Sequence, residues 1–223
     1  MESLEQNQTR PNPPRRKASK EERKRQLIEA TMECIATHGI SGTTVSEVAK
    51  QAGLSTGIVN FHFVSKERLL EEVLDFLAKE HRNQWHTAIQ AEGLSEADKL
   101  HAIVEAHFHP FICNRKKLAV WFAFYGESAT RASYRAIMSE IDDERWAVAT
   151  DLISSLIKEG GYQNVEAINV ASTLEGLFDG LALSIMIYPG EFSNTDGYRR
   201  AYEYLCLCFP QHFKPLPKAE CVS

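Results

Sequence analysis

Four aromatic side chains fall within five consecutive residues, at Trp121, Phe122, Phe124 and Tyr125. On a helix, Trp121, Phe124 and Tyr125 would share one side at spacings of three and four residues, whereas Phe122 would point elsewhere. Aromatic faces attract cations, and a cage of such faces recognises quaternary ammonium groups. The spacing therefore indicates either a site for a compact organic cation or an ordinary hydrophobic core.

Two further aromatic residues, Phe108 and Trp146, lie on neighbouring predicted helices and could complete such a cage, with an acidic side chain balancing the ligand's charge. The candidate ligand-binding residues are therefore Phe108, Trp121, Tyr125 and Trp146.

A second set of residues has the spacing of a DNA-reading unit. Between residues 43 and 63, two short helices are predicted on either side of a turn at Gly53. Thr44 and Glu47 form a capping box for the first helix, and Ser55 is a ready N-cap for the second. The second helix presents small and polar side chains on its outer face, a pattern that suits insertion into a DNA major groove.

No catalytic signature accompanies these sets. The sequence has no phosphate-binding glycine loop, no nucleophile elbow and no separated pair of cysteine couplets. His101, Glu105 and His109 share one helical face and could hold a metal ion, but an ordinary mixed helix face explains them equally well. We therefore expect no catalytic residue, no metal and no cofactor.

Composition narrows the setting. Apolar residues make up 43% of the 223, five cysteines are scattered without a disulfide pattern, and the N-terminus is polar and basic. No apolar run is expected to span a membrane. These features indicate a cytoplasmic protein.

Charge is divided unevenly along the chain. The net charge is −5, yet residues 1–68 carry 11 Lys and Arg against 8 Asp and Glu, while the remainder carries 14 against 22. Such an asymmetry is typical of a DNA-reading end joined to an acidic body. The basic residues near the N-terminus could form either a solvated helix start or an arm that touches DNA.

Hydrophobic periodicity predicts an all-α chain of about nine helices. Besides the two short helices, the predicted segments are 20–38, 65–90, 95–109, 114–128, 132–158, 165–188 and 196–209.

The last two predicted helices carry a broad apolar stripe. It comprises Val170, Leu174, Leu177, Phe178, Leu181 and Ile185, followed by Tyr198, Tyr202, Leu205 and Phe209. Gly176 and Gly180 would let another backbone approach closely. This pattern favours a four-helix dimer interface over burial within one chain.

The motif and its flanking segments resemble the TetR family of bacterial repressors. The resemblance runs from about Lys24 to Leu74, including Gln26-Leu27-Ile28-Glu29-Ala30 and Ser65-Lys66-Glu67-Arg68-Leu69-Leu70. It implies a homodimer on a palindromic DNA operator. The DNA-binding residues that we expect are Thr44, Ser46, Ser55, Thr56, Gly57, Ile58, Asn60, Phe61, His62 and Lys66.

Within this set, the resemblance places Thr56, Gly57 and Ile58 at base edges. Asn60, Phe61, His62 and Lys66 are placed along phosphates. Many family members carry Tyr at the position of Asn60, which could here donate to a phosphate or read an adenine edge.

A closer resemblance, to the BetI-type regulators, rests on Ser55-Thr56-Gly57-Ile58, Trp121-Phe122-Ala123-Phe124 and Phe178-Asp179-Gly180-Leu181. Such regulators repress genes for choline uptake and its oxidation to glycine betaine, and they respond to choline. The chain departs from that pattern at Phe61-His62, at Tyr125 and in its long N-terminal extension.

The sequence therefore predicts four segments. Residues 1–18 form a disordered basic arm, 19–66 a helix-turn-helix DNA-binding domain, 67–210 a ligand-binding and dimerisation domain, and 211–223 a loose tail. The function is transcriptional repression modulated by a choline-like effector. A TetR-type repressor sensing another small apolar or cationic molecule is the nearest alternative, and a helical enzyme or ligand-storage protein is an alternative of another class.

Overall fold

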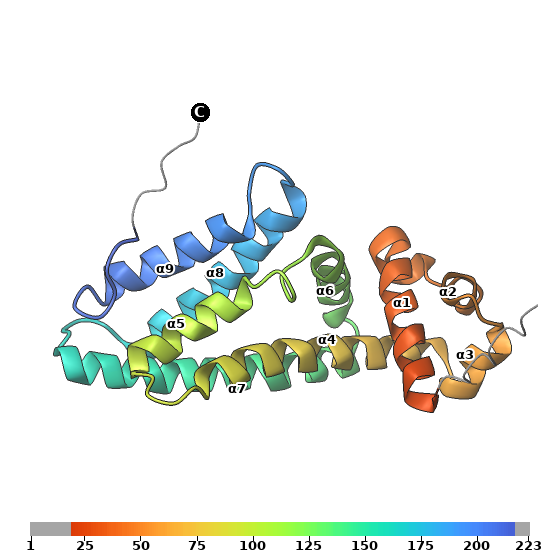
Figure 1. Ribbon diagram of the computed structural model, residues 1–223, viewed down its shortest axis with the longest axis horizontal. Helices are drawn as coiled ribbons and strands as arrows, with labels where there is room; N and C mark the ends of the chain where they lie inside the picture. The colour runs from red at the N-terminus through yellow and green to blue at the C-terminus, as the bar shows by residue number, and fades with distance from the viewer. Residues whose placement is uncertain (1–18, 217–223) are drawn as a thin grey trace, which may run out of the picture.

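The computed structural model describes residues 19–216, and within that range every regular element is a helix (Figure 1). The elements are α1 (Lys20–Gly42), α2 (Val45–Ala52), α3 (Thr56–His62), α4 (Lys66–Ile89), α5 (Glu96–His107), α6 (Arg115–Ser128), α7 (Ala132–Gly160), α8 (Ala167–Ile187) and α9 (Asn194–Cys208). The predicted all-α class is confirmed for the described residues. The basic arm expected at 1–18, and residues 217–223 of the expected tail, lie outside them.

Local capping chemistry sets several helix starts. The Ser65 hydroxyl accepts a hydrogen bond from the Arg68 amide at 3.1 Å and begins α4. Ser95 and Asp98 form a reciprocal capping box at the start of α5. These side chains satisfy amides that have no partner within the helix, which is why their positions in the sequence located the helices.

The end of α1 differs from the prediction. We expected Gly39 to end the helix, and Gly39 does adopt a non-helical conformation with φ 70° and ψ 175°. The chain then adds a short further turn to Gly42. The positive φ at Gly39 is one that glycine adopts without a steric penalty, so the residue makes a kink inside α1.

The helices form a small head and a larger body. Figure 1 shows α1, α2 and α3 at one end of the molecule, with α4 running from them into the body beside α7. The head's hydrophobic core draws on α1–α4 and also on Phe124 of α6 and Tyr134 of α7. A second core joins α5, α7, α8 and α9 with the far end of α4. Because α6 packs against α1, it links the body to the head.

Two sequence expectations in the body need correction. The sequence predicts no apolar run long enough to span a membrane, but α8 is long and apolar enough to do so by length and composition. Its inner side packs into the body core. We also expected a loose tail from residue 211, yet Phe213 is buried against Tyr202 and Phe209, so the chain remains packed at that point.

Candidate functional site

The outer face of α3 is exposed because one residue anchors the helix. Val59 is fully buried in the head's core. Successive residues turn by about 100°, so Gly57 and Phe61 lie opposite Val59, with Asn60 and Ile58 flanking them. Gly57, Asn60 and Phe61 are exposed, and Phe61 is 76% accessible. This face has the shape that a groove-reading helix requires.

The remaining residues of the predicted DNA-binding set lie around this face. Thr56 and Ser46 are exposed, and His62 is half-buried. The Thr44 hydroxyl accepts from the Glu47 amide at 3.2 Å and caps α2, although the reciprocal half of the expected capping box is not formed. Ser55 occupies the N-cap position of α3 without making a side-chain cap bond.

Lys66 has an intramolecular role that the sequence did not indicate. Its ammonium donates to the Ile40 carbonyl oxygen at 3.0 Å and so ties the start of α4 to the end of α1. An ammonium has three donors, which leaves two for a phosphate. The bond therefore holds the ammonium at the edge of the head.

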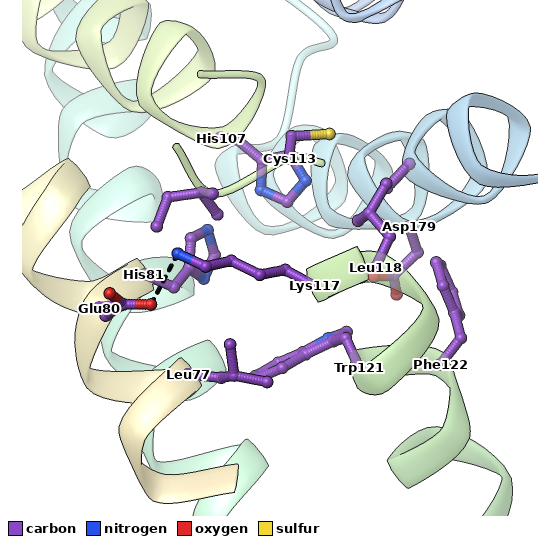
Figure 2. A pocket seen from close by; sticks show the side chains of 12 residues that line it. Leu77, Glu80, His81, His107, Cys113, Lys117, Leu118, Trp121, Phe122 and Asp179 are labelled. Atoms are coloured by element: carbon purple, nitrogen blue, oxygen red, sulfur yellow. Dashed lines mark ion pairs between the residues drawn. The ribbon is translucent and has the colours of Figure 1, made fainter. Parts of the chain in front are cut away.

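A cavity lies between α4, α5, α6 and α8 in the body (Figure 2). Its walls are Leu77, Glu80, His81, His107, Ile112, Cys113, Lys117, Leu118, Trp121, Phe122, Asp179 and Ala182. Its volume is about 60 Å³, counted as the space that the centre of a water molecule can occupy. One water needs about 10–15 Å³ on this measure, so the cavity has room for about four to six waters and suits a small, compact molecule.

An ion pair crosses this cavity. Figure 2 shows Lys117 reaching from α6 toward Glu80 on α4, and the ammonium lies 2.7 Å from the carboxylate. The Lys117 ammonium also donates to the Phe111 carbonyl oxygen at 2.8 Å and sits 4.0 Å from the centre of the Phe111 ring. The adjacent Lys116 pairs with Glu33 of α1 at 2.7 Å. The first turn of α6 is thus tied both to the cavity wall and to the head.

Two neutral histidines line the same space. Burial and the nearby Arg145 charge hold the pKa values of His81 and His107 well below their ordinary value. The Nδ1 atom of His81 lies 3.2 Å from an Arg145 nitrogen, and because a guanidinium can only donate, Nδ1 must accept. The His81 proton therefore sits on Nε2, which is buried without a protein partner. Nδ1 of His107 is likewise unpartnered.

A buried charge network backs the cavity. Arg145 of α7 donates through Nε to Glu175 of α8 at 3.0 Å, and through Nη2 to the other Glu175 oxygen and to Asp142 at 3.1 Å. The bonds and charges of its carboxylate partners outweigh burial and raise the Arg145 pKa. The network joins α4, through His81, to α7 and α8.

Carboxylates outnumber cations in this region. The Tyr125 hydroxyl donates to Asp179 at 3.3 Å. Burial raises the pKa of both Asp179 and Asp142, and Glu175 adds repulsion to each. With Glu80 and Lys117 cancelling, Arg145 faces three carboxylates, so the local charge is negative by about two when all are ionised. A bound cation would be favoured here.

The structure separates the four predicted cage residues. Trp121 lines the cavity. The Tyr125 ring packs edge-on against the Trp121 ring, with 6.1 Å between the two ring centroids. Phe108 is buried against Phe178 and does not line the cavity, because its ring fills the space beside Gly197. Trp146 also lies off the cavity and donates its indole N–H to Ser172 at 3.2 Å. A cage of all four is therefore not formed.

Sequence reasoning missed the polar residues of this cavity, namely Glu80, His81, His107, Lys117 and Asp179. Glu80, His81, His107 and Lys117 belong to no recognisable sequence motif. Asp179 stood within one of the segments that resembled the BetI-type regulators, and that position was the one available signal.

The apolar stripe predicted for dimerisation faces inward instead. Val170, Leu174, Phe178, Leu181, Ile185, Leu205 and Phe209 are all buried in the chain's own core. The outer sides of α8 and α9 instead expose Leu183, Ile187 and Leu207, and Leu207 is 82% accessible. A Cβ added at Gly176 or Gly180 would meet nothing within 4 Å, so the outer face of α8 is open at both glycines.

Comparison with known proteins is consistent with both halves of this arrangement. Residues 27–73 match the family model for bacterial regulatory proteins of the tetR family, and residues 96–209 match that for the C-terminal part of BetI-type transcriptional repressors. The chain is 31% identical over 191 residues to the HTH-type transcriptional regulator BetI of Burkholderia thailandensis, covering 84% of this chain and 94% of that one.

Solved structures share the fold. A regulator from Pseudomonas aeruginosa PAO1 matches with a TM-score of 0.76 at 26% identity, covering 88% of this chain and 96% of that one. A regulator from Saccharomonospora viridis, solved in complex with choline, matches with a TM-score of 0.73 at 21% identity, covering 83% and 96%. The latter likeness is one of fold.

Proposed function

The chain belongs to the TetR family of transcriptional regulators, with a BetI-type C-terminal region, and from this premise we propose that it is a cytoplasmic homodimeric repressor whose effector is choline or a related compact quaternary ammonium compound. It is a DNA-binding regulator and not an enzyme.

The observation that carries the effector proposal is the pairing of Trp121 with surplus negative charge. The Trp121 ring lines a cavity that Asp179 also lines, and Asp142 and Glu175 lie behind it. An aromatic face and carboxylates both favour a desolvated cation. Asp179 is exposed at one side, yet the protein around it and the Glu175 charge raise the pKa of its carboxyl, and an incoming cation would reduce this cost.

The histidines add a second requirement. The Nε2–H group of His81 is a buried donor without a partner, which costs free energy until a ligand atom accepts from it. A ligand with an oxygen a few bonds from its cationic centre would meet both requirements. The choline hydroxyl fits this description, and so does the carboxylate of a betaine.

Dimerisation would use the outer faces of α8 and α9. The exposed side chains of Leu183, Ile187 and Leu207, next to Gly176 and Gly180, support this placement. A twofold dimer presents two reading helices, so the operator would be palindromic. The Leu183→Glu variant should sediment as a monomer, whereas Val64→Glu in the exposed α3–α4 loop should remain a dimer; a dimeric Leu183→Glu variant would exclude this face.

A mobility-shift experiment tests the function as a whole. The full chain is mixed with DNA flanking its own gene, with and without millimolar choline, at several salt concentrations. A retarded complex that weakens steeply with salt and responds to choline is expected, because phosphate contacts release counterions. No retardation on any flanking fragment would contradict DNA regulation, and a complex indifferent to choline would contradict the effector.

The alternative effector is another small apolar or cationic metabolite. Part of the cavity wall is apolar, with Leu77, Ile112, Leu118 and Ala182. Tight binding of a neutral ligand with no response to choline would favour this alternative.

A further inference from the structure

The outer face of α3 carries no guanidinium or ammonium group. Between Thr56 and His62 there is no Lys or Arg. The cationic residues on either side are Lys50 of α2 and Lys66 of α4, and the Lys66 ammonium is held by the Ile40 carbonyl. The commonest base-specific contact to guanine is a bidentate bond from Arg or Lys, and this face cannot make one.

The side chains that this face does carry suit A·T base pairs. Asn60 is exposed on the flank of the groove-facing side, and a carboxamide can bond both N6 and N7 of adenine. Phe61 is the outermost large side chain of α3. A phenyl ring has no hydrogen-bond donor for a phosphate, but it can pack on the C5-methyl group of thymine.

His62 does not restore a guanine contact. It lies about 60° from the buried Val59 direction and is half-buried. Its ring packs edge-on against Phe61, with 5.3 Å between ring centroids, and tilted against Phe63 at 6.4 Å. Ile58 lies on the same flank as His62, opposite Asn60, and is apolar. The groove-facing surface therefore offers the Asn60 carboxamide and the exposed Thr56 hydroxyl beside apolar groups, with no guanidinium or ammonium group.

We propose that α3 reads adjacent A·T base pairs in each half of the operator, with Asn60 on an adenine edge and Phe61 on a thymine methyl group. The inference rests on the proposed DNA-binding function and adds base identity to it. The basic groups beside α3 then contribute affinity for phosphates without selecting sequence.

The test begins with selection of sites from randomised duplexes by the full chain, followed by anisotropy titrations of the selected site. Replacing one thymine with uracil removes only the methyl group, and replacing one adenine with 7-deazaadenine removes only the N7 acceptor. At one position in each half-site, uracil should weaken wild-type binding about fourfold, the effect of one buried carbon. At a neighbouring pair, 7-deazaadenine should weaken it about fivefold or more.

Matched variants assign each effect to its residue. Phe61→Ala should bind thymine and uracil duplexes equally, and Asn60→Ala should bind adenine and 7-deazaadenine duplexes equally. The control Val64→Ala, at a 91% exposed apolar residue outside α3, should keep both discriminations. Selected half-sites with G·C at the read positions, or wild-type binding indifferent to uracil everywhere, would overturn the inference while leaving DNA binding intact. Failure to select any motif would overturn the proposed function as well.

Discussion

Replacing Trp121 with leucine should selectively weaken the binding of cations. Leucine keeps much of the apolar bulk of the cavity wall but removes the π face that lies near Asp179. A desolvated cation over a tryptophan ring gains about 2 kcal/mol, and 1.4 kcal/mol corresponds to tenfold in affinity. We therefore expect choline to bind Trp121→Leu about 30-fold more weakly than it binds the wild type.

Calorimetry with two ligands separates charge from shape. The neutral isostere 3,3-dimethylbutanol has the size of choline without its charge, so its affinity should change little in Trp121→Leu. Trp146→Leu is the matched control, because Trp146 bonds Ser172 away from the cavity and its loss should leave choline binding unchanged. An equal loss for both ligands, or choline binding within threefold of wild type in Trp121→Leu, would refute the cation–π reasoning.

The other predictions concern the charge network behind the cavity. Arg145→Met should lower the free energy of unfolding, measured in urea, by about 3–5 kcal/mol, because Glu175 loses its buried partner. The double variant Arg145→Met/Glu175→Leu should recover most of this lost stability. A double variant as unstable as the single one would contradict the pairing. Choline affinity should fall on acidification, since burial raises the Asp179 pKa and protonation removes a charge that attracts the cation; calorimetry should find this slope flattened in Asp179→Asn. His81 and His107 have pKa values held well below 6.5, so the unfolded chain binds more protons and stability should fall below pH 6.5, by up to about 1.4 kcal/mol per pH unit for each histidine; urea midpoints unchanged from pH 6.5 to 5.5 would disprove this.

Local signals in the sequence were enough to locate the helices. Ser65 and Ser95 cap helices where the pattern predicted them, and Gly53 makes the left-handed turn between α2 and α3. Such signals depend on residues within one turn of each other. Gly39 also left the helical conformation as expected, although the chain continued for a further turn.

Contacts between distant residues could not be predicted in this way. Arg145 and Glu175 lie thirty residues apart, and the bond from Lys66 to Ile40 spans twenty-six. An apolar stripe also does not reveal what covers it, so the periodicity that predicts a dimer surface on α8 fits a face packed into the chain's own core equally well. Likewise, the position of Phe108 on a neighbouring predicted helix made it a candidate for the ligand cage, whereas in the structure its ring packs against Phe178.

The most direct test of the account is a titration of a preformed complex between the full chain and labelled operator DNA, followed by fluorescence anisotropy. Choline should change operator affinity by at least several fold. The two reading heads of the dimer can take two spacings, and an effector that binds one of these conformations more tightly shifts the equilibrium toward it. The neutral isostere 3,3-dimethylbutanol should leave operator affinity unchanged at the same concentration. An operator affinity that is identical with and without saturating choline would contradict a choline-responsive regulator.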